Sequence, residues 1–582
     1  MQLVAYGSQD LYLTGNPQMT YFKAIYRRHT NFATEYIRLD FETLPSFSTT
    51  STTQARVKIP RHAELVHDCY FVIDMPPIYG EYISGFKWVD NLGFNLINNV
   101  SLTIAGAQID KHYGKWLIIW NELTLSDEKK RNLYKMISMD EIPIPDQNLL
   151  TSFVGLNNTN TKGILYSKKR LRIPMFFWFC TNPGLSLPLI SLQYNEVYIN
   201  FEFVRLNDLF TLSPFNFTPE YYFSSDGISN IINYDNFLKS GDVNFFVENH
   251  EYNTALNEIY TPTTLLYYFL STSGTGNLSQ WIPNPHLEAN YIYLDEGERK
   301  LFAKYTQEYL ITQVQYQETP GLVGGANVVR LKFNHPVKEL VWTFRRDDSD
   351  IYNNHNNYTY IPSHRRYKQL MEYLESMGNG MVISSIANSI MKKEAFAESL
   401  SNVQFNQLVI NLLKLNATDS NNITDNVLNI FQNGKFKFNG KDRFREKDFK
   451  FFTESQIWSK QSGNPVIPGI NCYSFALKPE KHQPSGTCNF SRLDKVEFLF
   501  TLKKNWRNVS PNASIPSENI PHVYTFSIFK QSHIPTQDIT NIYNNLSDVQ
   551  IDSSKLYILD MYAVNYNILR IMGGMGDVAF AN

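Results

Sequence analysis

The chain has 582 residues and a formal net charge of −2, with 53 basic and 55 acidic side chains. This length allows two to four ordinary domains or two large all-β domains, and the charge balance argues against a nucleic-acid-binding protein, which usually carries a basic face or stripe. Aromatic residues make up 14% of the chain, including 36 Tyr and 40 Phe, a content typical of half-buried sheet surfaces and large interfaces.

The N-terminal sequence contains no recognisable targeting segment. "MQLVAYGSQD" lacks a basic region followed by an apolar stretch, so no signal peptide is expected. No window of the chain approaches the 18 apolar residues of a membrane-spanning helix. The run "QMTYFKAIYRRHTNFATEYI" (18–37) then gathers aromatic and basic residues, types that are enriched in interface cores. These residues are Tyr21, Phe22, Tyr26, Arg27, Arg28 and His29.

Short alternating apolar runs, separated by Gly, Pro and Asn, dominate the rest of the chain. Examples are "ARVKIP", "NVSLTIAG", "NEVYINFEF", "VVRLKFN" and "DKVEFLFTL". Their period of two predicts strands. Helical signals are few: a short charged helix from Ser126, a helix over 365–377 that ends at "GNG", and a short helix after Asp295 that connects two larger units.

An internal duplication with a very long period organises these strands. Five segments of the first part match five of the second part in the same order, which is hard to obtain by chance. The matched segments are 32–42 with 302–318, 57–66 with 331–341, 100–110 with 435–444, 187–203 with 486–500, and 290–302 with 556–569. The sequence separation between matched segments changes along the chain, which places insertions at about 124–175, 206–286 and 346–430. The last of these has helical character. Insertions confined to a few loops are expected when the strands form a rigid sandwich.

Each copy is therefore predicted to be a β-sandwich of about eight short strands with some long connections, a pattern that favours a jelly roll over an up-and-down barrel. The alternative is an immunoglobulin-like array, but its copies would be nearer 100 residues each and its Cys…Trp…Cys spacing is missing. The predicted fold class is all-β: two tandem eight-stranded jelly rolls with short helices in the loop insertions.

The sequence offers no enzymatic or metal site. It contains no phosphate loop, HExxH, GxSxG or GxGxxG motif. His62 and His67, five residues apart, would lie on opposite faces of a strand and could not share a metal. The acidic residues near Arg299 read as the charged start of the connecting helix, and the basic run "SKKRLR" (167–172) as a solvated loop or a contact with an acidic neighbouring subunit. No enzyme activity, metal or cofactor is expected.

The four cysteines also bear on the cellular setting. Cys69, Cys180, Cys472 and Cys488 form no CxxC pair, so neither a zinc ribbon nor a disulfide framework is expected. A reducing compartment is the expectation that follows.

Several long stretches closely resemble the major capsid proteins of nucleocytoplasmic large DNA viruses, with giant, mimivirus-like members the most similar. They are "YGSQDLYLTGNPQMTYFKAIYRRHTNFATE", "NGKDRFREKDFKFF", "PGINCYSFALKPEKHQPSGTCNFSRLDKVEF" and "YAVNYNILRIMGGMGDVAFAN". The resemblance implies a double jelly roll and a homotrimer with a pseudo-hexagonal outline that tiles an icosahedral virion shell. It also implies assembly in the host cytoplasm. The alternative function is a carbohydrate-binding tandem jelly roll used for host attachment.

The resemblance also gives the N-terminal segment a role. The expected division is an arm at 1–30, a first jelly roll at 31–297 and a second at 298–582. In this family the arm lies on the inward side of the capsomer, so Tyr21, Phe22, Tyr26, Arg27, Arg28 and His29 become candidates for an assembly interface. The arm would grip a neighbouring capsomer, a minor capsid protein or the surface of an inner viral membrane. The alternative is that the three aromatic residues fill the base of their own sandwich.

Overall fold

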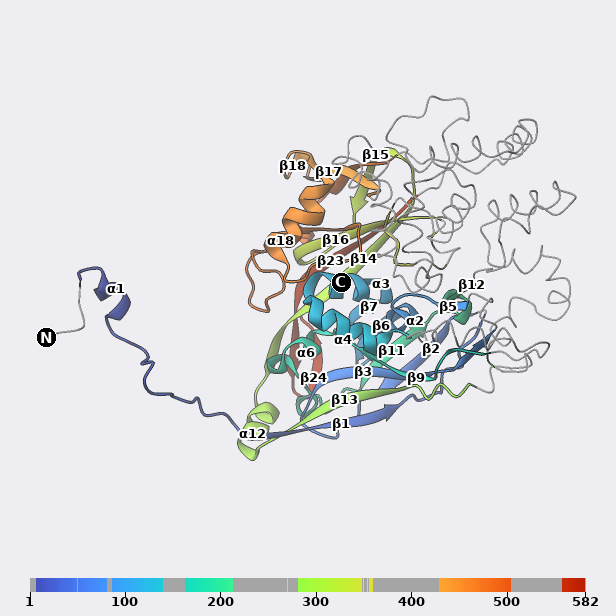
Figure 1. The fold of residues 1–582 in the computed structure, drawn as a ribbon. Coiled ribbons are helices and arrows are strands. Elements are labelled where there is room, and N and C mark those ends of the chain that lie inside the picture. The colour runs from blue at the N-terminus through green and yellow to red at the C-terminus, as the bar shows by residue number, and fades with distance from the viewer. Residues whose placement is uncertain are drawn as a thin grey trace, which may run out of the picture.

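The computed structural model describes residues 7–49, 51–80, 86–139, 163–212, 281–347, 429–503 and 557–580, together with residue 270 and a few positions between 349 and 359. Within these ranges the chain forms a body of stacked β-sheets, from which residues 7–31 extend as an arm (Figure 1). The predicted helix at 365–377 lies outside the described residues, as does most of the predicted insertions 206–286 and 346–430.

Two antiparallel sheets form the first half of the body. One has the strand order β1-β13-β3-β10, with β9 also paired to β3, and the other has the order β2-β11-β6-β7. The strands are β1 Phe32–Asp40, β2 Thr53–Lys58, β3 Leu65–Met75, β6 Ile97–Ile104, β7 Ala107–Tyr113, β9 Lys169–Pro174, β10 Leu187–Pro188, β11 Val197–Phe203 and β13 His286–Leu294. Alternate residues of β11 point into the core between the sheets, from Val197 to Phe203. The predicted period of two is therefore confirmed in this strand.

Two further antiparallel sheets form the second half. Their orders are β14-β23-β16-β20, with β21 and β24 at the side, and β15-β22-β17-β18, with β19 paired to β17. The strands are β14 Gln307–Leu322, β15 Gly325–Leu331, β16 Pro336–Arg346, β17 Phe431–Phe438, β18 Lys441–Asp442, β19 Lys447–Asp448, β20 Ile470–Ser474, β21 Cys488–Asn489, β22 Val496–Leu502, β23 Tyr557–Met572 and β24 Met575–Val578. Trp342 lies at the centre of the core, with the rings of Phe436, Phe452 and Phe498 at 5.2–5.7 Å from its own.

The two halves repeat the same strand order, which confirms the predicted duplication. Each of the five matched segments falls on equivalent strands. The equivalent strands are β1 and β14, β2–β3 and β15–β16, β6–β7 and β17–β18, β10–β11 and β21–β22, and β13 and β23. Each half is thus a sandwich of two facing sheets, as predicted.

Helices fill the space around the sandwiches. The predicted helices after Ser126 and Asp295 are present as α4 (Asp127–Ile137) and α12 (Glu296–Lys304). Asp295 caps α12 by accepting a hydrogen bond from the Glu298 amide at 2.9 Å. The other helices are α1 Asp10–Thr14, α2 Leu92–Leu96, α3 Gly114–Thr124, α6 Trp178–Thr181, α18 Gln456–Lys460 and the short turns η2 Pro183–Leu185, η3 Leu189–Ser191, η4 Leu206–Asp208, η6 Phe451–Ser455 and η7 Phe490–Arg492. Two small sheets pair β4 (Ile78–Gly80) with β8 (Gly163–Tyr166) and β5 (Phe86–Trp88) with β12 (Phe210–Leu212).

Helix α3 lies between the two halves, where Figure 1 shows it beside α4, β7 and the second half's sheet. Its Trp116 ring packs on Tyr562 of β23 at 5.0 Å. The backbone of the second half closes the end of α3, because the Gly463 amide donates to the Leu123 carbonyl at 2.7 Å. This bond satisfies a carbonyl that a helix C-terminus leaves unpaired. The sequence did not predict this helix or the contact that it makes.

Candidate assembly surfaces

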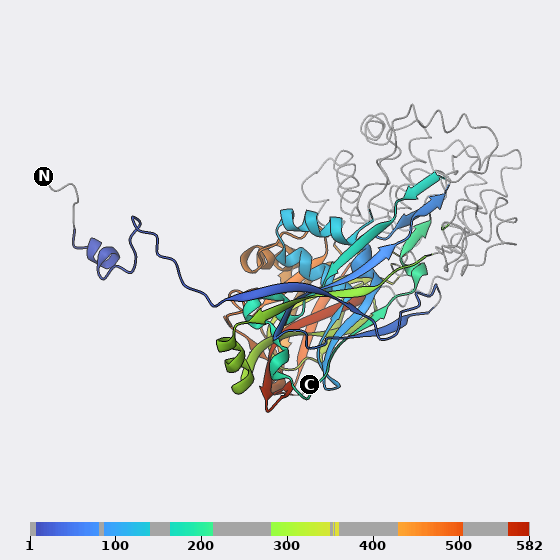
Figure 2. The same cartoon turned by 90° about the horizontal axis from the view of Figure 1, so that it is seen from below.

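The first surface is the N-terminal arm, residues 7–31, which extends away from the body in both views (Figures 1 and 2). The aromatic residues predicted for an interface, Tyr21, Phe22 and Tyr26, are 87–98% exposed. Arg27, Arg28 and His29 are exposed beside them. In this structure the three aromatic rings therefore do not fill the base of their own sandwich.

The arm exposes more apolar residues than were predicted from the sequence. Leu11, Tyr12 and Leu13 of α1 are also exposed, as are Met19 and Ile25. Several large apolar side chains exposed on one segment usually mark a binding site. Polar residues and helix-breaking residues surround "LYL", so no periodic apolar pattern indicated this part of the arm in the sequence.

A second apolar surface surrounds the point where the arm joins the body. Phe32 begins β1 and pairs with Leu294, directly before the cap of α12. Leu301 of α12 and Met572 and Met575 of the β23–β24 hairpin are exposed at the same end of the sheets. Figure 1 shows α12, β24 and the start of β1 together there. Apolar side chains are thus exposed both on the arm and on the end of the body that the arm joins.

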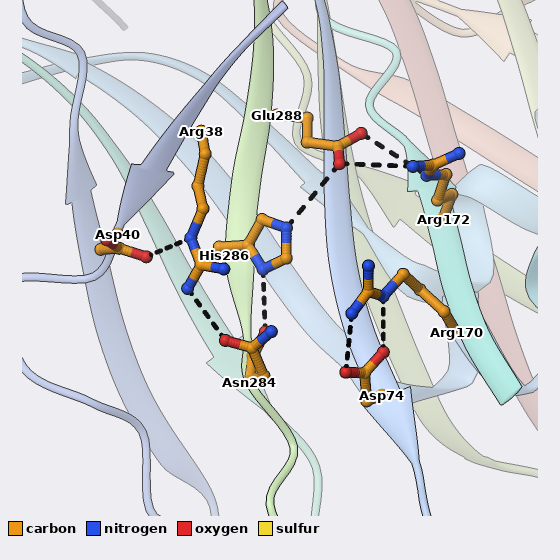
Figure 3. Close-up of polar contacts among 8 residues, drawn as sticks. All are labelled: Arg38, Asp40, Asp74, Arg170, Arg172, Asn284, His286 and Glu288. Atoms are coloured by element: carbon orange, nitrogen blue, oxygen red, sulfur yellow. Dashed lines mark hydrogen bonds and ion pairs between the residues drawn. The ribbon is translucent and has the colours of Figure 1, made fainter. Parts of the chain in front are cut away.

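The third surface is the outer face of the β1-β13-β3-β9 sheet, where charged side chains form a cluster (Figure 3). Arg170 of β9 donates two hydrogen bonds to Asp74 of β3, at 2.7 and 3.0 Å. These bonds hold the pKa of the Asp74 carboxyl below its ordinary value. Arg38 bonds Asp40 at 2.8 Å, but its side chain and that of Asp40 remain 49% and 69% exposed.

The same cluster contains one enclosed histidine. His286 is buried and its Nδ1 lies 2.8 Å from the Asn284 carbonyl, while its Nε2 lies 3.8 Å from Glu288. Glu288 is also 3.5 Å from Arg172 of β9. The arginine side chains of the cluster are about half exposed. Because ion pairs with an exposed partner add little stability in water, the cluster defines a charged surface more than it holds the sheet together.

The basic run 167–172 is therefore not the solvated loop that the sequence suggested. Lys169 to Arg172 belong to β9, and Arg170 and Arg172 engage carboxylates of their own chain. The run alternates buried Leu171 with exposed arginines, so the period of two was present in the sequence but was obscured by the density of charge.

The described residues contain no arrangement that points to catalysis. Among them, no group of three or more His, Cys, Asp or Glu side chains could hold a metal ion. His62 precedes β3 and packs on Tyr291 at 5.5 Å, while His67 contacts the Phe179 carbonyl at 2.6 Å, so the two serve separate local contacts. No described helix is long and apolar enough to cross a membrane.

Comparisons with known proteins place these surfaces in context. Residues 20–295 match the model of the major capsid protein N-terminus, and residues 298–534 match that of the large eukaryotic DNA virus major capsid protein. The major capsid protein of Phaeocystis pouchetii virus is 30% identical, covering 100% of this chain and 99% of its own. That of Paramecium bursaria Chlorella virus 1 is 29% identical over the same shares.

Solved structures give the same picture. A chain of the PBCV-1 virus capsid quasi-atomic model has a TM-score of 0.56 and 25% identity, with 97% of this chain and 100% of that chain covered. The Faustovirus major capsid protein has a TM-score of 0.55 at 12% identity, covering 97% and 94%. The second likeness concerns the fold alone, which is the double jelly roll expected from the sequence.

Proposed function

The chain belongs to the large eukaryotic DNA virus major capsid proteins and is a structural protein of the icosahedral virion shell; from this premise we propose that it assembles as a homotrimer with a pseudo-hexagonal outline. The observation that carries the proposal is the repeated strand order of the two halves. Three chains with two similar sandwiches each provide six similar sides, and a head-to-tail contact that closes after three copies produces a ring. Neighbouring trimers would then tile the shell.

We propose that residues 1–30 form an assembly arm, followed by jelly rolls at 31–297 and 298–582. The break between the two matched family models, at 295 to 298, supports this division. The exposed Tyr21, Phe22 and Tyr26 would be buried against a protein neighbour, either another capsomer or a minor capsid protein. Arg27, Arg28 and His29 would provide hydrogen-bond donors at the rim of that contact.

A protein neighbour suits the arm better than the inner membrane surface does. Aromatic and basic residues lie close together over a short stretch, a mixture typical of interface hot spots. A surface-lying membrane segment would instead separate an apolar face from a basic face along a helix, and the only arm helix among the described residues, α1, contains no basic side chain.

Assembly in the host cytoplasm is part of the proposal, and the four free thiols are compatible with that reducing setting. The matched models and the relatives named above are capsid proteins, so the carbohydrate-binding alternative gains no support. A non-enzymatic role is part of the same proposal, and the structural function of the family supports it.

The experiment is a mass measurement on the purified full chain, by light scattering across a dilution series. A species near three times 67.6 kDa supports the trimer, and a monomer at every concentration contradicts it. The variant Tyr21→Ser, Phe22→Ser, Tyr26→Ser should remain trimeric, because these side chains lie outside the body, but should lose association between trimers or with other capsid proteins.

Two matched measurements separate the partners of the arm. Val328→Ser, which alters an exposed apolar side chain on β15 outside the candidate surfaces, controls for a general loss of surface hydrophobicity. Flotation with anionic phosphatidylserine vesicles tests the membrane alternative, since binding that the triple variant loses would reassign the arm to a lipid surface. Unchanged association of the triple variant in both assays would contradict an assembly role for the three aromatic residues.

A further inference from the structure

The contact between the two halves buries one face of a sheet. The outer face of the β14-β23-β16-β20 sheet is covered by β7 and α3 of the first half. Tyr113 packs on Tyr316 at 4.6 Å and Trp116 on Tyr562 at 5.0 Å. A helix of one sandwich therefore lies across the sheet of the next sandwich along the chain.

This contact removes a cluster of charges from water. Arg345 of β16 bonds Asp560 of β23 at 2.8 Å, with side chains only 3% and 1% exposed. Tyr316 donates to the other oxygen of Asp560 at 2.6 Å, and Arg345 also reaches Glu318. Desolvating these charges is costly, so the first half must provide compensating contacts over the whole face.

The equivalent face of the first half remains partly exposed, because Arg38, Arg170 and Arg172 keep about half of their side-chain surface in water. Strand pairing fixes the equivalence, because Leu65 pairs with β10 as Pro336 pairs with β21, and β3 and β16 each have one register irregularity near their start. The equivalent positions are Asp40 and Glu318, His286 and Asp560, and Asp74 and Arg345. The charged cluster of Figure 3 thus repeats the buried cluster of the second half, but Arg38 and Arg170 are about half exposed.

The second half has a helical segment equivalent to α3, and the largest apolar side chain of that segment is exposed. In each half a helix follows the strand that ends the second sheet: α3 follows β7, and η6 with α18 follows β19. Phe452 packs in the core of the second sandwich, and Ile457 packs in the cluster that joins the two halves. Gln456 accepts a hydrogen bond from the Ser474 amide at 3.3 Å. Trp458 points outward and is 88% exposed. Its helix is therefore fixed while its largest apolar side chain faces solvent.

We propose that η6 and α18 of one copy dock on the outer face of the β1-β13-β3-β9 sheet of a second copy, with Trp458 as the central contact. The interface between copies would repeat the contact between the halves of one chain. Figure 1 shows the required order, with the β1-β13 face at one side of the stack, α3 in the middle and α18 toward the other side. The inference rests on the proposed trimer and assigns its contact surfaces.

The receiving face suits an aromatic anchor. Tyr36 of β1 and Tyr70 of β3 lie with ring centroids 6.2 Å apart beside the charged cluster, and Tyr36 is exposed. Tryptophan, tyrosine and arginine are the residues that dominate interface energetics. Burying Trp458 against this pair, with Arg38 and Arg172 at the rim, combines these types in one contact.

The first test compares Trp458→Glu with the wild-type full chain by sedimentation velocity over a dilution series. We expect the trimer dissociation midpoint to rise roughly thirty-fold or more, the scale of losing a hot-spot residue, with unchanged circular dichroism. Tyr36→Ala on the receiving face should weaken the trimer in the same direction. Val328→Glu, an exposed valine on β15 outside all of these surfaces, should leave the midpoint unchanged.

The second test needs no variant. Light and ¹⁵N-labelled copies are mixed, reassembled and treated with a carbodiimide, which joins amines to carboxylates without a spacer. Cross-links between copies should connect Lys447 or Lys460 with Asp40 or Glu288. A wild-type trimer without these cross-links, or one that Trp458→Glu leaves intact, overturns the assigned surfaces while the trimer proposal stands. A chain that is monomeric at every concentration overturns both.

Discussion

The contact between the two halves depends on a buried lysine, and Lys130→Met should loosen it. Lys130 of α4 donates to Glu122 of α3 at 3.1 Å and to the Asn464 carbonyl of the second half at 2.5 Å. Both side chains of the ion pair are only 4% exposed. Removing one partner of a buried pair costs about 3–5 kcal/mol. Glu122 keeps Tyr134 and the Val466 amide as donors, so the lower end, about 3 kcal/mol, applies.

Hydrogen exchange measures this loss of stability at the contact between the two halves. The amides of Gly463 and Val466 bond across it, to the Leu123 carbonyl and to the Glu122 carboxylate. A local opening made about 3 kcal/mol easier should speed their exchange roughly a hundredfold. Amides in the core of β22 should keep their protection, because the second sandwich itself is unchanged.

Two variants make the result decisive. Lys129→Met alters an exposed lysine of the same helix and should leave the exchange rates of both amides unchanged. Lys130→Met combined with Glu122→Gln removes both charges while retaining an acceptor for the Val466 amide, and should recover most of the lost protection. Equal exchange in Lys130→Met and Lys129→Met would refute the reasoning.

Two further predictions concern tight or enclosed positions. Gly463→Ala would place a Cβ 2.5 Å from the Leu123 carbonyl oxygen and should loosen the same contact, as measured by hydrogen exchange. Gly297→Ala, whose Cβ would have its nearest atom at 3.5 Å, should not change this exchange. Equal effects of the two substitutions would contradict the role of close packing. Burial, together with a hydrogen bond to Cys69, raises the pKa of the Cys180 thiol. Its thiolate fraction at pH 8 is therefore low, and iodoacetamide should label it at least about tenfold more slowly in the native than in the unfolded chain; equal rates by mass spectrometry would contradict this.

The duplicated sandwich could be predicted because each of its strands faces one core. Val197, Ile199 and Phe201 point inward on β11, as Phe498 and Phe500 do on β22, and their alternation survives in the sequence. A matched order of such strands then identified the second copy. This signal depends only on local patterning, so it did not require knowledge of how the two halves meet.

Helix α3 could not be predicted in the same way, because it is enclosed from several sides. Trp116, Ile118, Ile119 and Leu123 are all buried, since one side of the helix packs on its own sandwich and another on the second half. A helix without a solvent face loses the 3.6-residue pattern that reveals amphipathic helices. The sequence "GKWLIIWNELT" consequently resembles a buried strand as much as a helix.

Trp458 illustrates the opposite difficulty. A single tryptophan in "SQIWSK" carries no information about its direction, and large aromatic residues are highly buried on average. In the structure, Ile457 is buried while Trp458 is exposed, so the tryptophan faces outward. Sequence reasoning found the exposed arm because several unusual residues cluster there, but a fixed surface with one large side chain left no comparable signal.

The two equivalent charge clusters show why the same fold can serve two kinds of contact. Arg345 and Asp560 are dry in every copy, because the two halves are covalently joined and their meeting costs no association entropy. Arg170 and Asp74 occupy the matching region but keep part of their hydration, which allows the single chain to exist before a neighbour arrives. Exposed pairs are weakened by salt far more than buried ones. Salt should therefore weaken the contact between copies, whereas the contact between the two halves of one copy should persist.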